Sequence, residues 1–127
     1  MNRVSSDPLA QAIRSVLSPD LLKPRYRAQN MAGNPSFGHC YVASEAFYHL
    51  RGGKAAGWVP VCVRIGGDTH WWLRGPKGEI VDLTADQFKA PIPYAAGRGA
   101  GFLTSAPSAR AAEVIRRVRA RYPNLAR

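Results

Sequence analysis

Residues 58–83 read WVPVCVRIGGDTHWWLRGPKGEIVDL, and this stretch decides the fold. Its apolar residues are mostly β-branched or aromatic, which is typical of strands. Two turn signals divide it, GGD at 66–68 and GPKG at 75–78. We therefore predict a three-stranded antiparallel meander, with strands at 58–65, 69–74 and 79–83.

Helical patterns flank this predicted sheet. Residues 40–50 (CYVASEAFYHL) contain no helix breaker and have apolar residues at helical spacing. An amphipathic helix is predicted at 7–17 and a final, basic helix at about 106–121, while residues 23–39 are rich in turn formers. The expected fold is α+β, with helices packed on a small antiparallel sheet in a single domain, 1–127.

The charge of the chain is strongly positive. Eighteen Lys and Arg residues against eight Asp and Glu give a net charge of +10. Such a surface attracts polyanions, so nucleic acid or an acidic protein is a candidate partner, although a basic surface without a partner has equal weight. The apolar runs are too short to span a membrane, and the N-terminus lacks the apolar core of a signal peptide. With only Cys40 and Cys62, we expect free thiols and a cytoplasmic location.

Cys40 is the candidate nucleophile. It begins the predicted helix 40–50 after a glycine-containing turn, and the unpaired amides of a helix N-terminus favour a thiolate, so we expect a lowered pKa. An inert buried cysteine is the alternative. His70 lies early in the middle strand, and Asp82 on the next strand is expected to lie across from it. This order predicts a triad in which Asp82 orients His70 and His70 activates Cys40.

A cysteine at a helix start, then a histidine on a strand and an Asp on the next strand, resembles the papain-like superfamily. The Asp close behind the histidine is more similar to its transglutaminase branch. The resemblance covers residues 34–88 and implies a thiol hydrolase or acyltransferase acting on an amide, isopeptide or thioester bond of a peptide-like substrate. It also implies a side-chain amide that helps hold the oxyanion, and Asn34 in NPSFGHC is the matching position, with Asn30 or Gln29 as alternatives. The cysteine and tryptophan that flank the papain nucleophile are missing here, and the chain is short for this superfamily.

Four segments also resemble blocks of small uncharacterised bacteriophage and prophage proteins. They are GHCYVASEAFYHL at 38–50, THWWL at 69–73, DLTADQF at 82–88 and GFLTSAPS at 101–108. This second resemblance implies no biochemical activity. It would put the protein in the host cytoplasm during infection.

Other residues invite further interpretations. His39, Cys40, His49 and His70 do not have the spacing of a zinc site, so we expect no metal and no cofactor. Trp72 shares a strand face with His70 and is expected to shield it or to contact the substrate. The Pro- and Gly-rich residues 91–101 predict an irregular loop, and its stretch 97–101 predicts a flexible lid or an extended crossover. Tyr94 and Arg98 could line the cleft.

The final helix supports an alternative from another class of function. It is rich in arginine, and Arg116 and Arg117 are the residues expected to contact phosphate groups or an acidic surface. The alternative is therefore a non-enzymatic basic protein that binds nucleic acid or an acidic protein partner. In that case Cys40 would be a structural residue.

Overall fold

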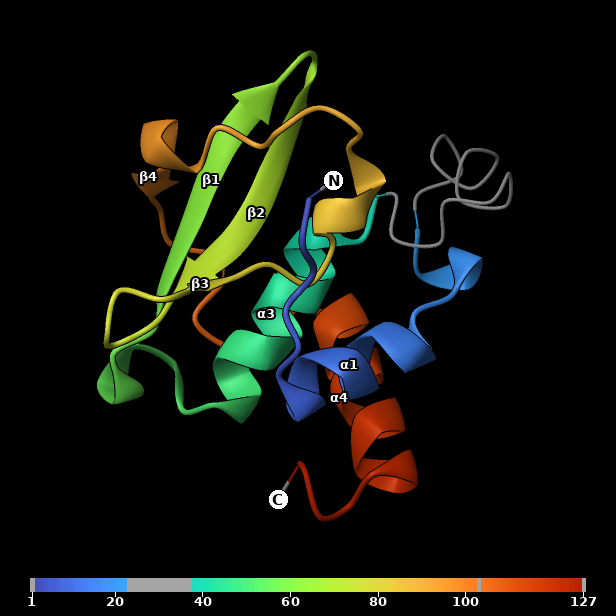
Figure 1. Ribbon diagram of the computed structural model, residues 1–127. Coiled ribbons are helices and arrows are strands. Elements are labelled where there is room, and N and C mark those ends of the chain that lie inside the picture. Colours follow the sequence, from blue (N-terminus) through green and yellow to red (C-terminus); the bar gives the residue numbers. More distant parts are fainter. Residues whose placement is uncertain (1, 23–37, 103, 127) are drawn as a thin grey trace.

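The computed structural model describes residues 2–22, 38–102 and 104–126 (Figure 1). In these residues the fold is α+β, with three α-helices and a four-stranded antiparallel sheet of order β3-β2-β1-β4. The elements are α1 (Pro8–Val16), η1 (Pro19–Leu21), α3 (Cys40–Leu50), η2 (Gly53–Ala56), β1 (Val59–Ile65), β2 (Asp68–Arg74), β3 (Ile80–Val81), η3 (Ala85–Gln87), η4 (Tyr94–Ala96), β4 (Arg98–Gly99) and α4 (Ala109–Arg121).

The β1–β2 hairpin forms as predicted. Its strands pair from Val59↔Arg74 to Ile65↔Asp68, around a turn in which Gly66 has a φ of 63°. A side chain rarely tolerates that backbone conformation, so glycine suits the position. Because the turn is short, it determines the register of the whole hairpin.

Strand β3 is shorter than the predicted 79–83. Only Ile80 and Val81 pair with β2, opposite Arg74 and Leu73. The backbone carbonyl of the next residue, Asp82, accepts a hydrogen bond from the Ser5 amide (3.0 Å) instead of continuing the sheet. The chain therefore leaves the sheet at Asp82, and the earlier part of β2 has no β3 partner on that edge.

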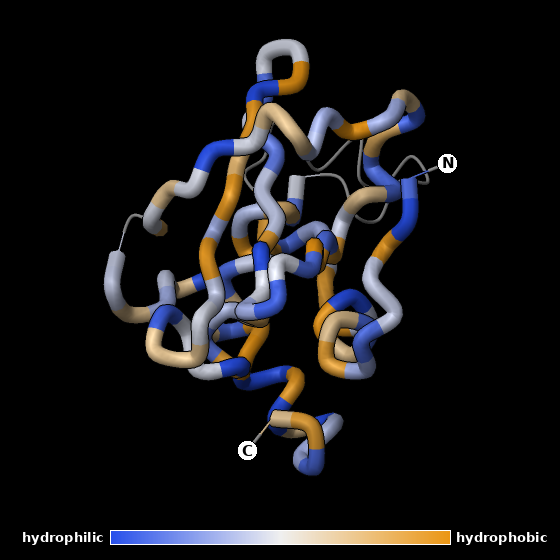
Figure 2. Tube along the Cα trace, turned by 60° about the vertical axis from the view of Figure 1, so that its left-hand side comes forward, coloured by the Kyte–Doolittle hydropathy of each residue, from blue (hydrophilic) through white to orange (hydrophobic). Residues whose placement is uncertain are grey.

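The helices begin where local capping permits. Asp7 caps α1 by accepting a hydrogen bond from the Leu9 amide (2.8 Å), and Pro8 occupies the first helical position. Ser108 caps α4 in the same way through the Ala111 amide (3.3 Å), so α4 begins later than the predicted 106. Apolar residues recur at helical spacing among the charged residues of α4 (Figure 2). The helix therefore buries only one face.

Two apolar clusters lie on opposite faces of the sheet. The three α-helices pack together under one face, where Phe47 and Leu73 are fully buried (Figure 1). Trp72, the neighbour of Leu73, points to the other face and packs with Val61, Ala85 and Ile92. The residues after β3 cover this second face and return to the sheet as β4 beside β1. The chain therefore crosses from one edge of the sheet to the other along this face, which agrees with the extended crossover expected at 97–101.

Candidate active site

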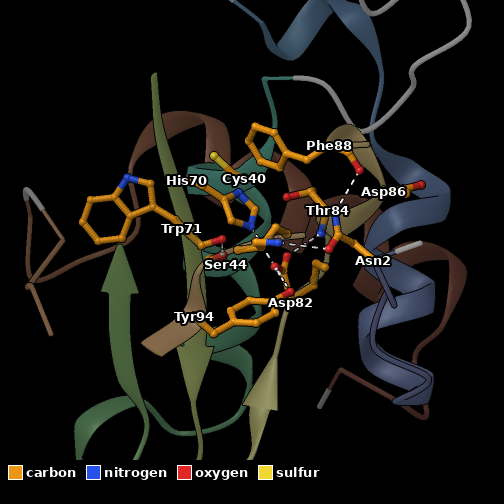
Figure 3. A network of polar contacts seen from close by, with 12 residues as sticks. Asn2, Cys40, Ser44, His70, Trp71, Asp82, Thr84, Asp86, Phe88 and Tyr94 are labelled. Carbon is orange, nitrogen blue, oxygen red and sulfur yellow. Dashed lines mark hydrogen bonds and ion pairs between the residues drawn. The ribbon is translucent and has the colours of Figure 1, made fainter. Parts of the chain in front are cut away.

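The first turn of α3 packs against the edge of β2 that β3 leaves open. The Cys40 thiol donates a hydrogen bond to the Thr69 carbonyl (Sγ–O 3.5 Å), and the Ser44 hydroxyl, one helical turn later, donates to the Trp71 carbonyl (3.3 Å). These two carbonyls flank His70. The edge contacts therefore hold the start of α3, and the thiol with it, beside His70 (Figure 3).

His70 and Asp82 form a buried hydrogen-bonded pair. The His70 Nε2 atom lies 2.7 Å from the Asp82 Oδ2 atom, and the exposed fractions of the two residues are 0% and 2%. The Leu73↔Val81 pairing explains the contact, because continuing that register puts Asp82 opposite Trp72, on the face that His70 shares. The predicted contact between His70 and Asp82 is confirmed.

The second nitrogen of His70, Nδ1, lies on the other side of the ring from Asp82. Within the described residues, His70 Nδ1 is buried and makes no hydrogen bond. Figure 3 shows the imidazole between the Cys40 sulfur and the Asp82 carboxylate. Since Asp82 accepts from the Nε2–H group, the lone pair of the neutral ring resides on Nδ1.

Asp82 is held by two further donors. The Thr84 amide donates to Oδ1 (3.1 Å), and the Tyr94 hydroxyl donates to Oδ2 (2.8 Å), the oxygen that also contacts His70. Burial and the adjacent Asp82 carboxylate raise the pKa of Tyr94, so its hydroxyl stays protonated. The carboxylate is therefore fixed in one orientation towards the imidazole.

The expected lowering of the Cys40 pKa is wrong. Burial is the main cause that raises the pKa of the Cys40 thiol to about 11; the Asp82 charge acts in the same direction, and backbone amides, chiefly that of Trp71, oppose these effects only in part. Cys40 is 7% exposed, so the loss of hydration outweighs the favourable helix N-terminus. In this structure Cys40 is a neutral thiol hydrogen-bonded to Thr69.

Aromatic side chains form a wall around His70. Phe88 meets the imidazole edge-on, with ring centroids 4.8 Å apart, and Trp72 lies 5.7 Å away. Trp72 is 2% exposed and packs against Tyr94 (5.0 Å), and its expected contact with a substrate or polyanion stays a prediction. The alternative expectation, that Trp72 shields His70, agrees with its position.

The N-terminal residues hold this wall in place. The Asn2 side-chain amide donates to the carbonyls of Phe88 (2.9 Å) and Ala90 (2.7 Å). Its carbonyl oxygen accepts a hydrogen bond from the Ile92 amide (3.1 Å). A residue far away in the sequence thus fixes the segment that carries Phe88 over His70.

The predicted binding arginines have different environments. Arg117 is partly buried and donates to the Val16 carbonyl (3.0 Å), while its guanidinium pairs with Asp20 (2.9 Å) and Glu113 (2.7 Å). Arg117 therefore joins α4 to the segment after α1, and its expected contact with phosphate groups or an acidic surface stays a prediction. Arg116 is exposed and pairs with Glu113 (2.7 Å) on its own helix.

The remaining expectations concern the oxyanion residue, a metal site and a membrane span. Asn34, the expected oxyanion residue, and its alternatives Asn30 and Gln29 lie outside the described residues. Among the described residues, no group of three or more His, Cys, Asp or Glu side chains could hold a metal ion. No helix in the same part of the chain has the length and apolar character needed to cross a membrane.

Sequence reasoning missed two contacts of the site. Ser44 follows Cys40 by four residues, so helical spacing already indicates that both face the same edge. No comparable sequence pattern indicated the contact between Tyr94 and Asp82, because that contact depends on the path of the chain between β3 and β4.

Comparison with known proteins identifies a family. Searches of curated proteins and of solved structures find no match to this chain. A family model described as "YunG protein" matches residues 5–127, which include Cys40, His70, Asp82 and Tyr94. A match over nearly the whole chain means that the protein belongs to the YunG protein family.

Proposed function

We propose that this protein is a thiol hydrolase or acyltransferase that acts on an amide, isopeptide or thioester bond. One observation carries the proposal: a buried imidazole is oriented by a carboxylate through Nε2, and its Nδ1, on the side of the Cys40 thiol, has no hydrogen-bond partner among residues 2–22, 38–102 and 104–126. That is the arrangement by which a general base activates a nucleophile. The order of Cys40, His70 and Asp82 along the chain, on a helix start, a strand and the end of the next strand, supports a likeness to papain and transglutaminases.

The neutral state of Cys40 favours general-base catalysis over a preformed ion pair. The His70 Nδ1 lone pair takes the thiol proton as sulfur forms a bond to the substrate carbonyl carbon, and the carbonyl π electrons move to oxygen. When the oxyanion collapses, the amine or thiol leaving group departs with the proton from Nδ1, and an acyl thioester remains on Cys40. Water or an amine then attacks this thioester, which completes hydrolysis or acyl transfer.

Asp82 has two roles in this scheme. Its hydrogen bond to Nε2–H keeps the imidazole in the tautomer that has its lone pair on Nδ1. Its negative charge then stabilises the imidazolium formed when His70 accepts the thiol proton, and this stabilisation is strong because the pair is buried.

Substrate access requires a change in the wall around the site. His70 is fully buried and Cys40 nearly so, and Phe88 covers the imidazole edge-on. The hydrogen bonds from Asn2 to the Phe88 and Ala90 carbonyls hold that cover closed. An acyl group can therefore reach the sulfur only after these side chains shift.

The test is to trap the acyl-enzyme. Wild-type protein and the variants Cys40→Ala, His70→Ala and Cys62→Ala are incubated with p-nitrophenyl acetate and with an acetyl thioester of N-acetylcysteamine, and intact masses are recorded. We expect an acetyl adduct in wild type and in Cys62→Ala, none in Cys40→Ala, and at least a hundredfold slower formation in His70→Ala. Cys62 is the matched control because it is the second free cysteine.

The proposal fails if Cys40 acquires no acyl group, or if His70→Ala acylates at the wild-type rate. An unreactive Cys40 together with salt-dependent binding of a DNA or RNA duplex would favour the non-enzymatic basic binding protein instead.

A further inference from the structure

We propose that Tyr94 is a positioning residue of the thiol site, and that its hydroxyl sets the pH range in which His70 acts as a base. This inference rests on the proposed function but makes a separate prediction. Tyr94 belongs to η4, in the irregular segment between β3 and β4, and it touches Asp82 rather than the thiol.

The contact geometry ties Tyr94 to His70 through one atom. The Asp82 Oδ2 atom accepts hydrogen bonds from His70 Nε2 (2.7 Å) and from the Tyr94 hydroxyl (2.8 Å). A carboxylate oxygen only accepts, so the tyrosine hydroxyl must be the donor. With the Thr84 amide on Oδ1 (3.1 Å), the charge of Asp82 is shared among three donors.

The segment around Tyr94 is built to bring the phenol to this position. Strand β4 pairs with β1 through Val61↔Gly99, which anchors the chain just after η4. Gly97 lies so close to the Trp72 indole that a Cβ atom there would overlap it. The Tyr94 ring packs edge-on against the same indole, at 5.0 Å between centroids. The close passage of the chain over Trp72 therefore determines where the hydroxyl lies.

Removing the hydroxyl changes the balance of charge at Asp82. Tyr94 and His70 compete for one oxygen, so without Tyr94 the carboxylate attracts the protonated imidazole more strongly. The variant is therefore expected to hold the proton on the ring to a higher pH than wild type does. We expect the pH midpoint for His70-dependent chemistry to rise by about one unit, and the rate below that midpoint to fall up to about tenfold.

Three other titratable groups leave the expected rise of the His70 midpoint unchanged. Cys40, from α3, is neutral because burial raises its pKa to about 11. His39, which precedes it, is also neutral at pH 7 because burial lowers its pKa to about 4. Asp86 of η3 is paired with Arg14 of α1 (2.8 Å).

The test uses Tyr94→Phe, which keeps the ring that packs on Trp72 and removes only the hydroxyl. Tyr122→Phe is the matched control, since the Tyr122 hydroxyl bonds to Ser15 away from the site. Two readouts are taken from pH 4 to 10: the rate of Cys40 alkylation by iodoacetamide, and the His70 ring signals in ¹H–¹⁵N NMR spectra. Urea unfolding of each variant verifies the fold.

We expect both midpoints to rise by about one pH unit in Tyr94→Phe and to stay at the wild-type value in Tyr122→Phe. Unchanged NMR midpoints in a folded Tyr94→Phe variant would overturn the inference and leave the acylation result standing. If the NMR midpoint moves while Cys40 forms no acyl adduct, the coupling of Tyr94 to His70 holds and the proposed function fails.

Discussion

We predict that His39 lowers the stability of the protein in acid, because its imidazole ring is buried. The residue is fully buried at the N-cap of α3, and neither ring nitrogen has a hydrogen-bond partner within the described residues. Loss of hydration lowers its pKa from 6.5 to about 4, which the charge of Asp20 opposes only in part. The folded protein thus keeps His39 neutral over a pH range in which the unfolded chain protonates it.

The sign and size of the effect follow from proton linkage. Because the folded pKa is lowered, the unfolded state binds the additional proton, and stability is lost as the pH falls below 6.5. The interval from 6.5 to about 4 corresponds to about 3 kcal/mol in the free energy of unfolding. Between pH 7.5 and pH 5 the expected loss from His39 is about 2 kcal/mol.

The assay is urea unfolding followed by tryptophan fluorescence at pH 7.5 and pH 5. The test variant is His39→Leu, which cannot titrate, and the control is His49→Gln near the other end of α3. Titration of carboxyl groups lowers the free energy of unfolding of all three proteins at pH 5. The informative quantity is therefore the difference between the losses of wild type and each variant from pH 7.5 to pH 5. We expect His39→Leu to lose about 2 kcal/mol less than wild type, and His49→Gln to follow wild type. Equal losses in wild type and His39→Leu would refute the reasoning.

Three further predictions concern contacts that hold the fold together. Glu45→Gln should lower the free energy of unfolding, measured in urea, by about 1–3 kcal/mol. The reason is that the buried Glu45 carboxylate accepts two hydrogen bonds of 2.7 Å at the start of α4. An unchanged urea midpoint would contradict this prediction. Gly97→Ala should lower the free energy of unfolding by about 1–3 kcal/mol and change the tryptophan fluorescence, because the new methyl group overlaps the Trp72 indole. A variant with the wild-type spectrum and stability would disprove the overlap. Arg117→Ala should lower the Tm more than Arg116→Ala does. Of these two arginines, Arg117 joins α4 to the segment after α1, whereas Arg116 pairs with Glu113 on its own helix. Equal shifts in Tm would count against this role of Arg117.

Local patterns in the sequence were enough to predict the elements that carry the site. The predicted helix 40–50 coincides with α3 because its start follows a turn and its end meets glycines, and both signals lie within a few residues of the helix. The hairpin was predictable for the same reason, since the turn at Gly66 sets its register. The position of Asp82 near His70 was predictable from the second turn, at 75–78, because that turn brings the next strand back along β2.

Tertiary structure alone decided the state of the thiol and the contacts of Asp82. The pKa of Cys40 depends on how much water the surrounding chain excludes, which no local pattern around the residue records, so the expected lowering became a rise to about 11. Tyr94 reaches Asp82 only because β4 returns to β1, and Arg117 turns inward only because Asp20 and the end of α1 lie beside α4. The sequence by itself determined the bounds of α3 and the register of the β1–β2 hairpin, because those signals are local, whereas the end of β3 and the pairing of β4 depend on distant segments. Burial and charge pairing depend on segments that are distant along the chain, so only the folded structure determined them.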